Sequence, residues 1–129
     1  TRSYLFEYDP FTHTGVWATT QLNDTWSVGN GIATGSDTFF DAPTSRANYL
    51  GQLKWAPPNG RSTAILNVVI TNPKFIESEA FAQYNFYNLI YTYKINERTS
   101  YLMDAGYAHM KDVPNIGATD WYGIANYIM

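Results

Sequence analysis

The chain has 129 residues, a length that suits one domain, and it contains no cysteine, which excludes a disulfide framework and a thiolate metal site. Its formal net charge of −3 offers no basic surface, so nucleic acid is not expected as a partner. No apolar run approaches the ~20 residues of a membrane helix, which excludes a helical membrane protein. Charged residues make up only 15% of the chain, against ~25% in typical soluble domains, and aromatic residues 17%.

The first half of the chain alternates apolar and polar residues in short segments, which is typical of strands with two unlike faces. Tight turns are predicted at residues 23–25 and 57–60, where asparagine, glycine and proline supply turn geometry. The stretches 35–46 and 72–82 lack alternation and are expected to be longer loops. The expected strands are the end of a strand at residues 3–8, then 13–22, 26–34, 47–56 and 62–71.

The strongest strand signal lies between residues 83 and 111, which are predicted to form one hairpin that turns at residues 96–98. About 13 residues at ~3.3 Å each, tilted by ~45°, cover about 30 Å, which is the thickness of the hydrocarbon core of a bilayer. The alternation therefore predicts a transmembrane β-hairpin. Residues 112–119 carry Asp, Pro, Asn and Gly and are expected to be a third long loop, followed by a last strand from residue 120 to 129.

The two faces of the expected strands differ in chemistry. One face carries aliphatic residues between two sets of aromatic residues, an arrangement that lipid interfaces favour. The other face is polar but carries few charges, as the lumen of a water-filled barrel would. The residues expected to face lipid are Leu66, Val68, Ile70, Leu89, Tyr91 and Met103. The candidate pore-lining residues are Gln52, Lys54, Asn67, Asn88, Lys94 and Asp104.

Catalysis and metal binding find little support in the sequence. His13, His109, Ser27 and Asp104 could be considered for a catalytic site, but parity puts His109 with the lipid-facing residues, where a histidine at headgroup level is the simpler interpretation. Asp37 and Asp41 share one loop, but they lack the glycine and glutamate spacing of a calcium loop. We therefore expect no enzyme activity, no metal site and no cofactor.

Several short motifs resemble the β-barrel porin-2 (OmpL-like) family. They are PFTHTGV at residues 10–16, QLND at 21–24, WSVG at 26–29, DTFFD at 37–41, ANYLG at 47–51 and DWYGI at 120–124. The resemblance implies a bacterial outer membrane of the Gram-negative type and a water-filled pore. It supplies no catalytic residues.

These observations together predict an all-β fold, an antiparallel up-and-down transmembrane β-barrel segment of about seven to eight strands. Residues 1–129 would be a single β-barrel domain or, as an internal fragment, part of a larger barrel. The expected function is that of an outer-membrane porin allowing passive diffusion of small hydrophilic solutes or ions, with the lipid bilayer as partner and a homo-oligomer left open. Two alternatives remain: a small non-conducting membrane barrel that acts as an anchor or adhesin, and a soluble ligand-binding β-barrel.

Overall fold

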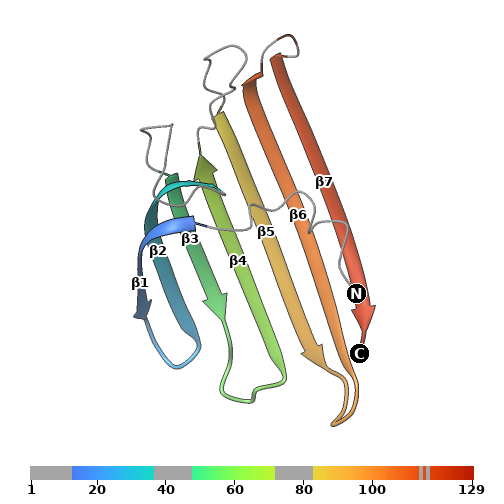
Figure 1. Cartoon of the computed structure of the whole chain (residues 1–129). Helices are drawn as coiled ribbons and strands as arrows, with labels where there is room; N and C mark the ends of the chain where they lie inside the picture. Colours follow the sequence, from blue (N-terminus) through green and yellow to red (C-terminus); the bar gives the residue numbers. More distant parts are fainter. Residues whose placement is uncertain (1–12, 37–47, 72–82, 114, 116) are drawn as a thin grey trace.

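Seven antiparallel strands form one sheet in the order β1-β2-β3-β4-β5-β6-β7, so that each strand pairs with its neighbours in sequence (Figure 1). The computed structural model describes residues 13–36, 48–71, 83–113, 115 and 117–129. Among these residues it contains no helix that could span a membrane. The strands are β1 (His13–Gln21), β2 (Trp26–Ser36), β3 (Asn48–Trp55), β4 (Ser62–Thr71), β5 (Gln83–Lys94), β6 (Ser100–Val113) and β7 (Gly117–Ile128).

The three short turns at one end of the sheet share a device, because in each an asparagine side chain closes the turn. Asn23 Oδ1 accepts hydrogen bonds from the backbone N–H of Thr25 and of Trp26, both at 2.9 Å. Asn59 accepts from the N–H two residues later at 3.0 Å, and Asn96 does the same at 2.9 Å. Such Asx turns replace a backbone hydrogen bond and fix the reversal of the chain. The predicted turns and the strands that they join are therefore confirmed.

The connection between β6 and β7 corrects the prediction of a long loop at residues 112–119. Pairing continues to Val113, which lies opposite Gly117, so only residues 114–116 lie between the two strands. Asp112 and Asn115 have φ angles of 59° and 66°, and Gly117 has one of 85°. Asp, Asn and Gly tolerate this left-handed conformation better than other residues. Residues that suggested a loop by composition instead make a tight reversal, and the ladder is irregular between Met110 and Val113.

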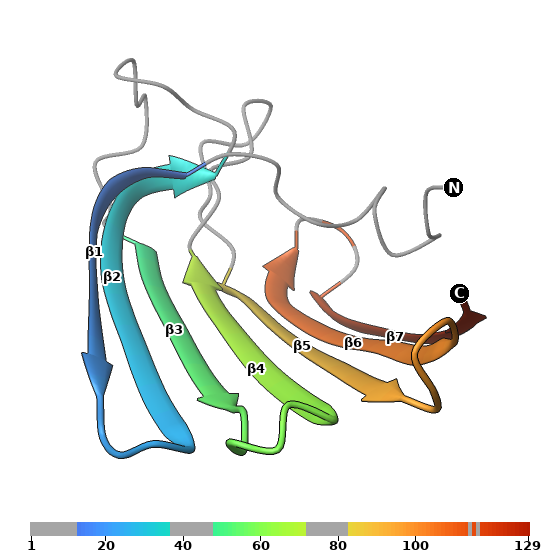
Figure 2. The same ribbon diagram turned by 90° about the horizontal axis from the view of Figure 1, so that it is seen from below.

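The sheet is curved into an arc, with β1 at one end and β7 at the other (Figure 2). Side chains converge on the inner side of an arc and diverge on its outer side, so the less exposed face is the concave one. Among the described residues, the ladder register places every buried hydrophobic or polar side chain on one face, which we call the concave face. These residues are Ala33, Asn48, Val69, Thr71, Phe86, Asn88 and Ala108.

The predicted strand end at residues 3–8 and the predicted loops at 35–46 and 72–82 lie wholly or largely outside the described residues. Among the described strands, β1 and β7 each pair with one neighbour only, so the sheet is not closed. An open, curved, up-and-down sheet of seven strands is the architecture of a barrel segment.

Candidate functional site

Exposed apolar side chains extend across the whole width of the convex face, from β1 to β7. Of the large hydrophobic side chains that are exposed within the described strands, all but Trp17 lie on this face. Leu66 and Leu89 lie opposite each other with exposed fractions of 38% and 37%, and so they do not lie in a protein core. A soluble protein rarely leaves so broad an apolar surface uncovered.

Aromatic side chains border this convex face in two rows. Near the short turns, Trp26 lies opposite Trp55, and Tyr93 lies opposite Tyr101. Near the other end of the strands the second row is formed by Tyr49, Tyr87 and Tyr107, and the rings of Tyr87 and Tyr107 stack with centroids 6.2 Å apart. In β3, β5 and β6 the two rows are separated by the same distance along the strand, about 20 Å at ~3.3 Å per residue. In strands tilted by ~45° the two rows would be about 14 Å apart along the membrane normal, which is less than the ~25 Å apolar band of outer-membrane barrels, so the rings would lie within this band.

A chain of polar side chains crosses the middle of the concave face, and we call it the polar strip: Gln52, Asn67, Asn88 and Asp104. Gln52 Nε2 donates to Asn67 Oδ1 at 2.9 Å, and Asn67 Nδ2 donates to Asn88 Oδ1 at 3.2 Å. Asn88 Nδ2 then donates to Asp104 Oδ1 at 2.7 Å. Every bond runs in the same direction, towards the carboxylate. Hydrogen bonds in such a chain polarise and so strengthen one another. Together they hold four side chains, from four strands, in one arrangement.

Charge on the concave face is sparse. Among the described residues of this face the charged side chains are those of Lys54, Lys94 and Asp104. Lys54 shares a row with Asp104, because Lys54 lies opposite Ile65, Ile65 opposite Ile90, and Ile90 opposite Asp104. Three strand spacings of about 4.8 Å separate the two charges by about 14 Å, so they do not form an ion pair. Lys94 lies at the end of β5 beside the short turn, and it is exposed.

Apolar side chains form the next row of the concave face, on the side of the polar strip that lies away from the short turns. Val69, Phe86 and Ala108 are buried there, with Leu50, Tyr84 and Trp121 packed against them. The rings of Phe86 and Trp121 lie 5.6 Å apart. At the other end of this row Trp17 lies over two glycines of β2. A Cβ atom at Gly29 would stand 2.0 Å from Cζ2 of Trp17, and one at Gly31 would stand 2.7 Å from its Cε3. Both glycines are therefore required to seat the indole ring.

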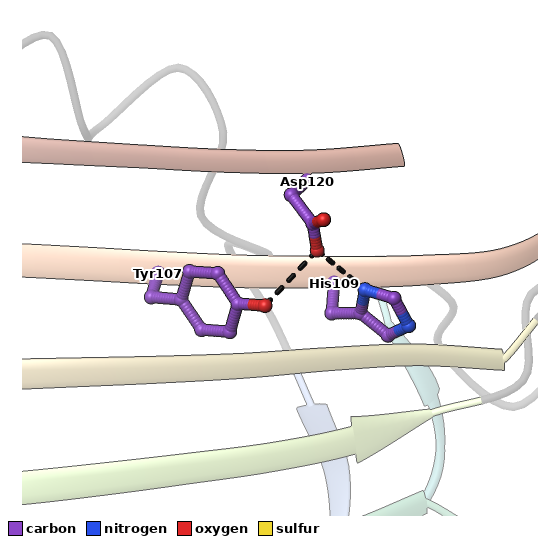
Figure 3. Close-up of polar contacts among 3 residues, drawn as sticks. All are labelled: Tyr107, His109 and Asp120. Atoms are coloured by element: carbon purple, nitrogen blue, oxygen red, sulfur yellow. Dashed lines mark hydrogen bonds and ion pairs between the residues drawn. The ribbon is translucent and has the colours of Figure 1, made fainter. Parts of the chain in front are cut away.

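A separate polar group lies on the convex face, at the end of β6 and β7 that is remote from the short turns. Figure 3 shows its three residues, Tyr107, His109 and Asp120. Asp120 of β7 accepts a hydrogen bond from the Tyr107 hydroxyl at 3.0 Å and contacts His109 Nδ1. The register brings His109 directly opposite Asp120. His109 lies on the Tyr107 face, as parity predicted, and its headgroup level stays a prediction. Its carboxylate partner was not foreseen.

The structure separates the candidate residues by face as parity predicted. The six candidate pore-lining residues lie on the concave face, and the six residues expected to face lipid lie on the convex face. Ser27 and Asp104 are on the concave face and His109 is on the opposite one, so the structure does not bring these three together. Within the described ranges no group of three or more metal-ligating side chains is found. Asp37, Asp41 and the side chain of His13 lie outside the described part of the chain.

A comparison with protein families shows to which family this sheet belongs. The model of the family described as "Putative beta-barrel porin-2, OmpL-like" matches residues 1–129. The chain belongs to this porin family. No curated protein and no solved structure matches the chain. Membership supports a porin-type role in general, and it agrees with the open antiparallel sheet and with the division of its faces.

Proposed function

We propose that the chain forms part of the wall of an outer-membrane porin, through which small hydrophilic solutes or ions diffuse passively. The convex face would contact acyl chains, and the concave face would line a water-filled lumen. In this arrangement the six concave candidates line the pore, and Lys54 and Asp104 are the charged groups nearest to its middle.

One observation carries the proposal: large exposed apolar side chains gather on the convex face, whereas the concave face carries the polar strip beside one apolar row. A soluble β-sandwich or lipocalin-like barrel would turn its apolar face inward and bury it. Here the apolar face is the convex one, and the hydrogen-bonded polar strip is on the concave side. In a bilayer this arrangement of the two faces is favourable, because apolar side chains contact lipid and polar side chains keep their hydrogen-bond partners.

The free edges of β1 and β7 add a requirement. Unpaired backbone N–H and C=O groups cost several kcal/mol each in hydrocarbon, so only closed barrels span membranes with strands. Further strands must therefore complete the sheet on both sides in the functional assembly. A barrel of only eight strands would be filled by its own side chains, whereas a larger one leaves an open channel.

Single-channel recording in planar bilayers tests the proposal, with two matched variants on the concave face. Asp104→Asn removes a negative charge from the lumen and should shift the reversal potential in a salt gradient towards anion preference. Lys54→Gln should shift it towards cation preference. Unchanged reversal potentials in both variants would contradict the pore-lining assignment. Absence of any conductance would favour the non-conducting barrel, and a detergent-free soluble monomer would contradict membrane insertion altogether.

A further inference from the structure

A shallow hollow of about 380 Å³ lies on the convex face, above the turn that joins β3 to β4. It is lined by Trp26, Leu53, Trp55, Ala64, Leu66 and Leu89. All six side chains are apolar, and they come from four adjacent strands. The volume falls in the range of small-molecule sites, which is about 300–1,000 Å³.

The hollow exists because a small residue lies within a row of large ones. Ala64 pairs with Trp55 on one side and with Tyr91 on the other, so a methyl group separates an indole from a phenol. Trp26, opposite Trp55, forms the far wall. Leu66 and Leu89 continue the hollow along the strands towards the middle of the sheet. The result is an apolar groove that begins at the aromatic row near the short turns and runs into the aliphatic band.

The turn that joins β3 to β4, beside this groove, carries a positive charge. Arg61 is the single charged residue of the turn 56–61, three residues before Ala64. Its guanidinium carbon lies 5.8 Å from the centre of the Tyr93 ring, and its backbone carbonyl accepts a hydrogen bond from the Lys94 N–H at 2.8 Å. The turn is thus tied to β5, and the guanidinium lies against an aromatic residue of the row near the short turns. An arginine held in this way binds phosphate well, through its planar set of donors.

We propose that this groove is a binding site for one anionic phospholipid, with an acyl chain in the hollow and the headgroup phosphate at Arg61. The inference rests on the proposed function, because it requires the convex face to meet a membrane. It goes further by assigning the site a preferred headgroup charge. Charge complementarity selects the occupant: the lining is wholly apolar, and the adjacent charge is positive.

Tryptophan quenching by brominated lipids provides a direct test. In a Trp17→Phe, Trp121→Phe background, Trp26 and Trp55 remain as reporters at the groove. The protein is reconstituted in phosphatidylcholine vesicles that contain a minor fraction of either acyl-brominated phosphatidylglycerol or acyl-brominated phosphatidylcholine. One arginine near the surface should favour the anionic lipid about fivefold over the zwitterionic one. Arg61→Gln should bring the ratio close to one.

Two further variants make the test specific. Arg98→Gln removes a charge from another short turn and should leave the lipid preference intact. Ala64→Phe fills the hollow and should reduce quenching by both brominated lipids at low mole fraction. A wild-type protein without preference, or an Arg61→Gln variant that keeps it, would overturn the proposal.

The competing occupant is a second copy of the chain. Its signature is a protein that inserts, forms a stable oligomer in detergent, and shows no quenching of Trp26 and Trp55 by either brominated lipid. This result would place a second protomer in the groove and overturn the lipid site. Failure of membrane insertion gives a different result, because then neither quenching in fully brominated vesicles nor conductance would be observed. Quenching without conductance would contradict the pore and leave the lipid site standing. Loss of lipid preference with conductance intact overturns only the lipid site.

Discussion

Two neighbouring apolar residues of β5, Leu89 and Ile90, provide a sharp test of the facing of the sheet. Leu89 lies on the convex face between the two aromatic rows, which β5 crosses at Tyr87 and Tyr93, and its exposed fraction is 37%. Leu89→Arg would place a charge near the midplane of the bilayer, at a cost of about 2–4 kcal/mol. Ile90 points to the concave side and lies directly opposite Asp104. Ile90→Arg would therefore place the same charge in the lumen, beside a carboxylate.

The magnitudes separate the two variants clearly. Ile90→Arg loses part of the burial of an aliphatic side chain, about 1 kcal/mol, and regains some of it by pairing with Asp104. The difference between the variants should then be about 2–3 kcal/mol, or roughly a 30- to 150-fold difference in the ratio of folded to unfolded protein. Reversible urea unfolding in lipid vesicles, followed by tryptophan fluorescence, measures this difference. Equal destabilisation of the two variants, or greater damage from Ile90→Arg, would refute the assignment of faces.

The remaining predictions concern the concave face and the β6–β7 reversal. Gly29→Ala should displace the Trp17 indole and cost about 1–3 kcal/mol of stability, and Trp17→Ala should remove most of that penalty in the double variant, as measured by urea unfolding. Asn88→Ala should cost about 2 kcal/mol, because it leaves Asp104 without its donor in the polar strip; Asn88→Asp would add repulsion between carboxylates and should be worse in the same assay. Asp112→Gly should keep or raise stability, whereas Asp112→Val should lower it by at least about 1 kcal/mol, since valine tolerates positive φ poorly. A stable Asp112→Val variant would contradict the left-handed geometry of the reversal.

Period-2 alternation predicted the strands and their facing well, because it depends only on local residue order. The strand at 62–71 and the hairpin from residue 83 to 111 show this most clearly. Alternation also predicted that Gln52, Asn67 and Asn88 share a face. It could not predict that they form one hydrogen-bonded row, because row alignment depends on the length and geometry of each turn.

The error at residues 112–119 shows the opposite limit. Proline, asparagine and glycine mark a reversal, but composition does not say how many residues the reversal takes. Three residues with positive φ angles make the reversal short. The β6–β7 ladder therefore extends to the pair Val113–Gly117, which a long loop at 112–119 would not contain. The contact between His109 and Asp120 depends on this compression, so it was out of reach of the sequence. The hollow beside Ala64 was missed for a related reason, since it requires the lateral order of four strands.

Each strand of this sheet pairs only with the strands adjacent to it in sequence, so the main contacts between strands lie within hairpins and between neighbouring hairpins. The entropy of closing each hairpin is small and does not grow with the size of the whole assembly. Hairpins can therefore be added one after another, and each new one needs only the edge left by its predecessor. The hairpin is then the natural unit by which such a sheet gains or loses strands. A change within one hairpin disturbs only its contacts with the strands on either side.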